Sequence, residues 1–184
     1  MGILRMRVVE FALLLSAVVD GRAPAQIVTD GTVGPAVTLR GPEFRIPAEL
    51  GRTVGPNLFH SFGTLDIRSG ESATFSGPAT INNVLARVTG GQPSSIDGSL
   101  QCTIPRANVL LVNPAGVVFG PDASVDVGGA FAVTTADYMR LADGGRFDAR
   151  NPGNDVLTVA PPSAFGFLAP GEAVASVHFR GSQL

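Results

Sequence analysis

Few side chains in this 184-residue chain have the chemistry that catalysis or metal binding requires. The single cysteine, Cys102, has Arg106 nearby but no histidine placed to act as its base, so a nucleophile is not favoured. His60 and His178 stand far apart, and neither has a second histidine or cysteine near it to share a metal. We therefore predict no catalytic residue, no metal site and no cofactor.

The carboxylates lead to the same expectation. Asp122 and Asp126 flank a predicted turn, but calcium takes about six to eight oxygen ligands, so two carboxylates fall short. The remaining acids are scattered singly and the chain has no lysine, which disfavours the clustered acids and positioned base of a polysaccharide lyase. That enzyme class remains the less favoured alternative, because a shared fold does not decide function.

Composition predicts one domain built from short strands. The chain has 23 glycines and 14 prolines, which interrupt long helices, and its 45% hydrophobic and 15% charged content excludes a disordered tail or a coiled coil. All 13 basic residues are arginine and the net charge is −2. Without a basic excess, nucleic acid is not an expected partner.

The N-terminus has the pattern of an export signal. Arg5 and Arg7 precede a nine-residue apolar run at 11–19, and the small residues Ala23 and Ala25 form a cleavage site. The apolar run is far shorter than the ~20 residues of a membrane-spanning helix. We predict a signal peptide over residues 1–25 and a mature chain that begins at Gln26, although a buried N-terminal helix is the alternative.

Short apolar segments separated by turns follow from there. Strands are predicted at 107–112, 117–119, 123–127 and 130–133, a turn at 94–98, and one helical turn at 135–141. The absence of helix–strand alternation excludes a doubly wound sheet and leaves a sandwich, a barrel or a β-solenoid. Alternation predicts that seven side chains point inward: Val109, Leu111, Val117, Phe119, Val125, Val127 and Phe131.

Several motifs resemble one family in order and spacing: residues 57–62 (NLFHSF), 81–91 (INNVLARVTGG), 93–98 (PSSIDG), 107–120 (ANVLLVNPAGVVFG) and 123–129 (ASVDVGG). The chain resembles the N-terminal two-partner secretion domain of filamentous-haemagglutinin-like adhesins. This resemblance implies an all-β, right-handed parallel β-helix with small extra-helical β elements. It also implies a non-enzymatic exoprotein that is recognised by the periplasmic domains of an outer-membrane barrel transporter and reaches the cell surface or medium.

The resemblance places two candidate recognition segments. One is the turn Asn113, Pro114, Ala115 and Gly116, where the family usually has Asn-Pro-Asn-Gly, so Ala115 departs from the pattern. The other is the motif Asn57, Leu58, Phe59, His60, Ser61 and Phe62. The turn could equally serve only as a corner of the fold, because Asn, Pro and Gly favour turns for local reasons.

Domain organisation follows from the same comparison. We expect a signal peptide at 1–25 and a secretion domain at 26–184, without the downstream adhesive passenger that follows such domains. The alternative function is an adhesin module that itself binds host or cell-surface glycans.

Overall fold

The computed structural model describes residues 26–168 and 174–182. The predicted signal peptide, residues 1–25, lies outside the described residues and stays a prediction. In the described ranges the helical elements are two 3-10 turns, η1 (Ala48–Leu50) and η2 (Pro152–Asn154), and no helix there is long and apolar enough to cross a membrane.

Strands make up the rest of the regular structure. Those of the coils are β2 (Glu43–Pro47), β4 (Asn57–Leu65), β5 (Ser72–Ser76), β6 (Asn83–Val88), β7 (Ser94–Ile96), β8 (Ser99–Cys102), β9 (Asn108–Val112), β10 (Val117–Phe119), β11 (Ser124–Val127), β12 (Phe131–Thr134) and β16 (Val177–Phe179). Two further strands, β1 (Ile27–Thr29) and β3 (Arg52–Val54), cover the N-terminal end of the coils. Outside the coils lie β13 (Tyr138–Leu141), β14 (Arg146–Asp148) and β15 (Pro162–Gly166).

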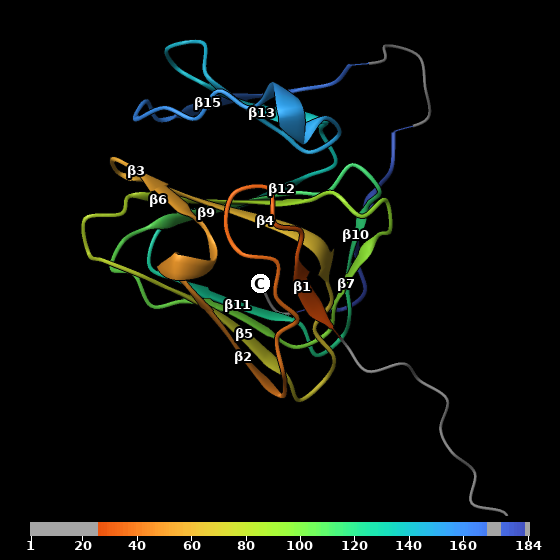
Figure 1. The fold of residues 1–184 in the computed structure, drawn as a ribbon. Coiled ribbons are helices and arrows are strands. Elements are labelled where there is room, and N and C mark those ends of the chain that lie inside the picture. The colour runs from red at the N-terminus through yellow and green to blue at the C-terminus, as the bar shows by residue number, and fades with distance from the viewer. Residues whose placement is uncertain (1–25, 169–173, 183–184) are drawn as a thin grey trace, which may run out of the picture.

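The coils form a parallel β-solenoid of about four turns, which confirms the predicted fold class. Three parallel sheets enclose a triangular cross-section: sheet A contains β4, β6, β9 and β12, sheet B contains β2, β5, β8 and β11, and sheet C contains β7, β10 and β16 (Figure 1). Each strand therefore pairs with its equivalent in the next coil, and residues far apart in sequence become neighbours.

Coil length varies, which explains why no exact repeat is visible in the sequence. Equivalent residues in successive coils lie 26 residues apart from Asn57 to Asn83, 25 from Asn83 to Asn108, and 22 from Asn108 to Ala130. Because the turns absorb these differences, the strands stay in register while the sequence period drifts.

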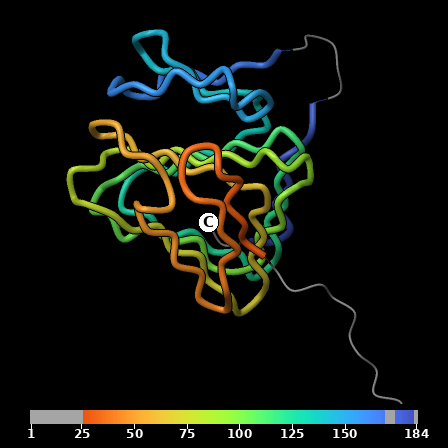
Figure 2. Tube along the Cα trace, in the orientation of Figure 1, coloured from red at the N-terminus to blue at the C-terminus, as the bar shows by residue number. Residues whose placement is uncertain are grey.

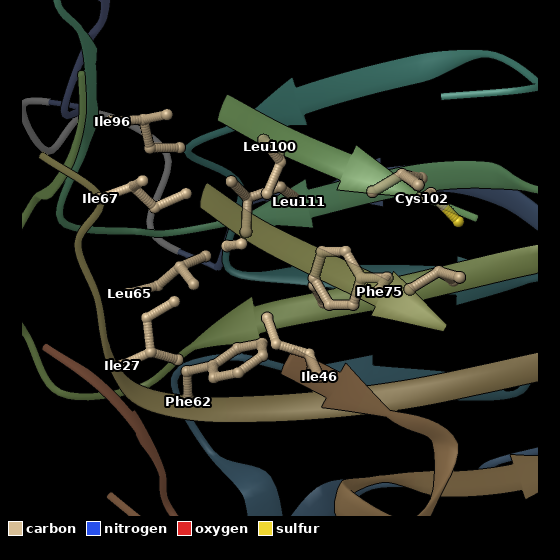
Figure 3. Close-up of a cluster of buried hydrophobic side chains, with 14 of the residues drawn as sticks. Ile27, Ile46, Phe62, Leu65, Ile67, Phe75, Ile96, Leu100, Cys102 and Leu111 are labelled. Atoms are coloured by element: carbon tan, nitrogen blue, oxygen red, sulfur yellow. The ribbon is translucent and has the colours of Figure 1, made fainter. Parts of the chain in front are cut away.

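Period-two alternation fills the interior with apolar side chains. Val109, Leu111, Val117 and Phe119 are at most 1% exposed, as predicted. Val125, Val127 and Phe131 also pack against this core, although they remain half-buried because β11 and β12 are the last strands of their sheets. Figure 3 shows the stacking directly, with Ile67 and Ile96 one above the other and Phe62 and Phe75 filling the middle.

The N-terminal end of the solenoid is covered by antiparallel chain. β1 and β3 both pair antiparallel with β4, and Ile27 of β1 is fully buried in the core. In Figure 2 this red and orange part of the chain crosses the open end of the coils. Such covering removes an exposed sheet edge that could pair with another chain.

An antiparallel sheet, sheet D, covers the outer face of sheet A. Its order is β14-β13-β15, and Met139, Leu141 and Phe147 form a second apolar cluster with side chains of sheet A (Figure 1). The helical turn predicted at 135–141 is wrong, because Met139 and Leu141 sit two residues apart on β13 and face this cluster.

Gly90 packs directly against the backbone of Gly63, so we expect Gly90→Ala to destabilise the fold. A Cβ atom at this position would lie 1.9 Å from the carbonyl oxygen of Gly63, so the backbone would have to move, at a cost of about 2 kcal/mol. Urea unfolding measures this loss. Gly153→Ala is the matched control, because no atom lies within 4 Å of the added methyl and its free energy of unfolding should stay the same or rise.

Candidate functional site

The turn between β9 and β10 is a corner built around one buried amide. Asn113 is 0% exposed, and its Nδ2 donates to the Gln92 carbonyl at 3.0 Å and to Ser94 Oγ at 3.1 Å. Its Oδ1 accepts from the Ala115 N–H at 2.9 Å. Asn113 therefore ties its own turn to the coil before it, and its polar atoms do not face the surface.

Of the other residues of the corner, Pro114 and Ala115 reach outward, whereas Gly116 is buried. Pro114 and Ala115 are half-buried, and Gly116 has a φ of +117°, a conformation that favours glycine. A pocket of ≈ 360 Å³ opens beside them, and its wall also includes Thr89 and Gly91 from the coil before and Ala149 and Arg150 from the segment after β14. The corner and the segment after β14 thus share one hollow.

Arg150, in the wall of this pocket, is bound by Asp137, which lies outside that wall. Arg150 Nε donates to the Asp137 carboxylate, which also accepts from the Leu168 N–H at 2.6 Å. Burial alone would raise the pKa of Asp137, but the hydrogen bonds from Leu168 and Arg150 outweigh it and hold that pKa below its usual range. The carboxylate therefore stays charged at neutral pH and fastens the segment after β15 to β13 through the Leu168 N–H.

Residues 94–98, predicted as a turn, contain a strand instead. Ser94–Ile96 is β7, which pairs in parallel with β10, and the change of direction is limited to Asp97 and Gly98. This correction matters for the corner, because pairing with β10 is what places Ser94 Oγ beside Asn113.

The second predicted segment is interior. Asn57, Leu58, Phe59, His60, Ser61 and Phe62 all lie in β4 and are all buried, so a partner that binds the folded domain would not reach their side chains. Asn57 begins a ladder: Asn83 Nδ2 donates to Asn57 Oδ1 at 2.9 Å, and Asn108 Nδ2 donates to Asn83 Oδ1 at 3.0 Å. Asn57 Nδ2 in turn donates to the Thr158 and Ala160 carbonyls, which fastens the loop after η2 to the solenoid.

His60 lies in the core rather than at a site. It is 0% exposed, its ring packs beside Phe62 and Phe75, and neither ring nitrogen has a hydrogen bond of normal geometry in the described part of the chain. Burial lowers the pKa of His60 to about 4, opposed by the Leu50 backbone. The imidazole is therefore neutral and acts as a packing group.

A buried arginine that the sequence analysis did not single out links sheet D to the solenoid. Arg87 on β6 is 0% exposed; its Nη1 bonds Asp155 Oδ1 and the Asp148 carbonyl, both at 2.7 Å, and its Nε donates to Ser61 Oγ at 2.7 Å. Its guanidinium also lies 4.1 Å from the centre of the Phe147 ring. The one signal in the sequence was an arginine inside the otherwise apolar segment 84–88.

The other side chains considered as nucleophiles or metal ligands are dispersed over the fold. Cys102 is buried, which raises the pKa of its thiol, and His178 is exposed on β16. Asp122 Oδ2 accepts from Ser69 Oγ at 2.7 Å, and Asp126 is exposed on β11. Among the described residues, no group of three or more His, Cys, Asp or Glu side chains is placed to hold a metal ion.

Comparison with known proteins assigns the family. The model of the TPS secretion domain matches residues 25–175, most of the chain, so the protein belongs to this family of two-partner secretion domains. The family is secreted through the outer membrane and implies an outer-membrane transporter as partner. The resemblance seen in the sequence is thereby confirmed.

One curated relative matches part of the domain. The heme/hemopexin-binding protein of Haemophilus influenzae is 37% identical over 87 residues. The match covers 47% of this chain but only 9% of that protein. Most of the relative therefore has no counterpart in the match.

Proposed function

We propose that this domain is the secretion signal of a filamentous-haemagglutinin-like exoprotein, and that the transporter reads the surface formed by Pro114, Ala115 and the adjoining pocket. The proposal rests on the different roles of the corner residues. Asn113 borders the hollow too, but both its amide atoms are used in hydrogen bonds within the fold, whereas the half-buried Pro114 and Ala115 line the hollow with apolar side chains. Asn113 therefore fixes the backbone conformation of the turn, and the transporter contacts Pro114 and Ala115, which this conformation places at the surface.

The signal peptide at 1–25 belongs to this proposal, since the transporter would meet the domain in the periplasm after export through the inner membrane. In this role the domain is not an enzyme. The dispersal of its carboxylates, thiol and imidazoles supports that view, because acid–base or nucleophilic catalysis needs such groups within hydrogen-bond reach of one another.

Filling the pocket should block recognition without unfolding the domain. We expect Ala115→Arg to lower secretion by a co-expressed cognate transporter about tenfold, a loss of roughly 1.4 kcal/mol in recognition, with the thermal midpoint of the purified chain unchanged. Immunoblotting of culture medium and cell fractions measures the effect. Ala79→Arg is the matched control, because Ala79 is exposed in a turn away from the corner. Equal secretion of both variants would remove the pocket from the transporter's contact surface.

Asn113→Ala tests whether Asn113 only stabilises the turn or is itself contacted by the transporter. The variant leaves the Gln92 carbonyl, Ser94 Oγ and the Ala115 N–H without their partner, so we expect a loss of about 2 kcal/mol in the free energy of unfolding. Secretion should fall no further than the unfolded fraction explains. Ala115→Asn, which restores the family's usual residue, should keep the fold and raise secretion modestly. A sharp secretion defect of Asn113→Ala at unchanged stability would mean that the amide itself is read.

A further inference from the structure

The outer face of sheet B is polar in a regular pattern and lies outside the transporter surface proposed above. Inward side chains alternate with outward ones along each strand, and the parallel register aligns the outward ones across the sheet. Two rows result: Glu43, Ser72, Ser99 and Ser124 in the first, and Arg45, Thr74, Gln101 and Asp126 in the second.

A hollow of ≈ 410 Å³ lies over these rows on β2, β5 and β8. Glu43, Arg45, Ser72, Thr74, Ser76 and Gln101 line it, together with Phe44. Thr74 Oγ1 donates to Gln101 Oε1 at 3.1 Å, and Gln101 Nε2 donates to Ser99 Oγ at 3.0 Å, so the amide is held in place. Within the described residues, neither Glu43 nor Arg45 takes part in a salt bridge.

We propose that this hollow binds a neutral glycan whose chain runs across the strands. A sugar presents hydroxyl groups that both donate and accept, and the hollow offers a carboxylate acceptor, a guanidinium donor and hydroxyl and amide groups that do either. Hydrogen bonds to the charged groups are the stronger ones. The strands lie ~4.8 Å apart, close to the length that one pyranose ring adds to an extended glycan, so each coil can meet one sugar.

The charges and residue types of the two rows restrict the class of glycan that can bind. Glu43 stands two residues from Arg45 on the same face, and Asp126 continues the row of Arg45, so an acidic glycan would meet repulsion. The two rows contain no aromatic side chain on which a sugar could stack, so affinity rests on hydrogen bonds and should be modest, with a Kd of about 1 mM. This site is independent of the transporter surface at Pro114 and Ala115.

The test is a titration of the purified, ¹⁵N-labelled chain with three neutral probes, cellohexaose, mannohexaose and xylohexaose, and one acidic probe, hexagalacturonate. We expect at least one neutral probe to shift the amide resonances of residues 72–76 and 99–101. The double variant Arg45→Met/Thr74→Val should weaken that binding about tenfold or more, whereas Arg52→Met/Thr53→Val, the same replacements at exposed positions on β3, should leave it unchanged.

Three results would overturn the proposal: no shift with any neutral probe up to about 10 mM, shifts centred away from sheet B, or equal weakening by the two double variants. Binding of hexagalacturonate alone would also overturn it, because the rows would then recognise acidic rather than neutral chains. Secretion of the Arg45→Met/Thr74→Val variant should equal that of the wild type, which keeps failure here distinct from failure of the transporter proposal.

Discussion

Arg87→Met is expected to lower the free energy of unfolding by about 4 kcal/mol, because it removes one member of a buried ion pair and leaves the other without its counter-charge. Asp155 would lose its partner at 2.7 Å, and the Asp148 carbonyl and Ser61 Oγ would lose their donor. Asp30 cannot replace the hydrogen bond that Arg87 donates to Ser61 Oγ, because Asp30 is a carboxylate and itself accepts hydrogen bonds from the Ser61 and Thr89 hydroxyls. Urea unfolding followed by circular dichroism measures the loss.

Hydrogen exchange of Arg87→Met should also show which part of the structure is destabilised. Arg87 joins β6 to the segment around Asp148 and Asp155, so hydrogen exchange should rise first in residues 138–166 while sheets B and C stay protected. Arg140→Met, at an exposed arginine on β13, is the control and should change little. The double variant Arg87→Met/Asp155→Leu should recover part of the loss, because the isolated charge is gone. A uniform rise in exchange would show that Arg87 supports the solenoid itself.

Arg87 also shows where reasoning from the sequence stops. Alternation predicts one buried and one exposed face for a strand, and this rule placed the interior residues of β9 and β10 correctly. It fails for β6, which is buried on both faces because sheet D covers its outer side. Whether a strand is covered twice depends on a segment about sixty residues later, and local pattern carries no information about that.

The candidate site too could be predicted from the sequence only in part. A turn at Asn113 to Gly116 could be predicted from the residue types alone. Its partners could not, because the Gln92 carbonyl and Ser94 Oγ belong to the coil before, 21 and 19 residues earlier, and coil length varies. For the same reason residues 94–98 were predicted as a turn: a three-residue strand such as β7 is recognisable only once its parallel neighbour β10 is known.

His60 should make the stability of the domain depend on pH between about 6.5 and 4. In the unfolded chain the imidazole binds a proton below pH 6.5, but burial lowers the pKa of His60 in the folded state to about 4. Between these values the unfolded state binds more protons, so the free energy of unfolding falls as the pH falls, by about 3 kcal/mol in total, and is constant above this window. Urea midpoints measured at pH 7.5, 6, 5 and 4 follow the change.

His60→Leu tests the assignment, because leucine fills a similar space beside Phe62 and Phe75 and binds no proton. Its stability should stay nearly level from pH 7.5 to about pH 4, and a common fall should appear only lower, where carboxylates with lowered pKa values such as Asp30 and Asp137 become protonated. Parallel pH curves for the two chains would mean that the folded His60 accepts a proton as readily as the unfolded one. The interior around it would then have to admit water, since no carboxylate of the described residues forms an ion pair with this ring.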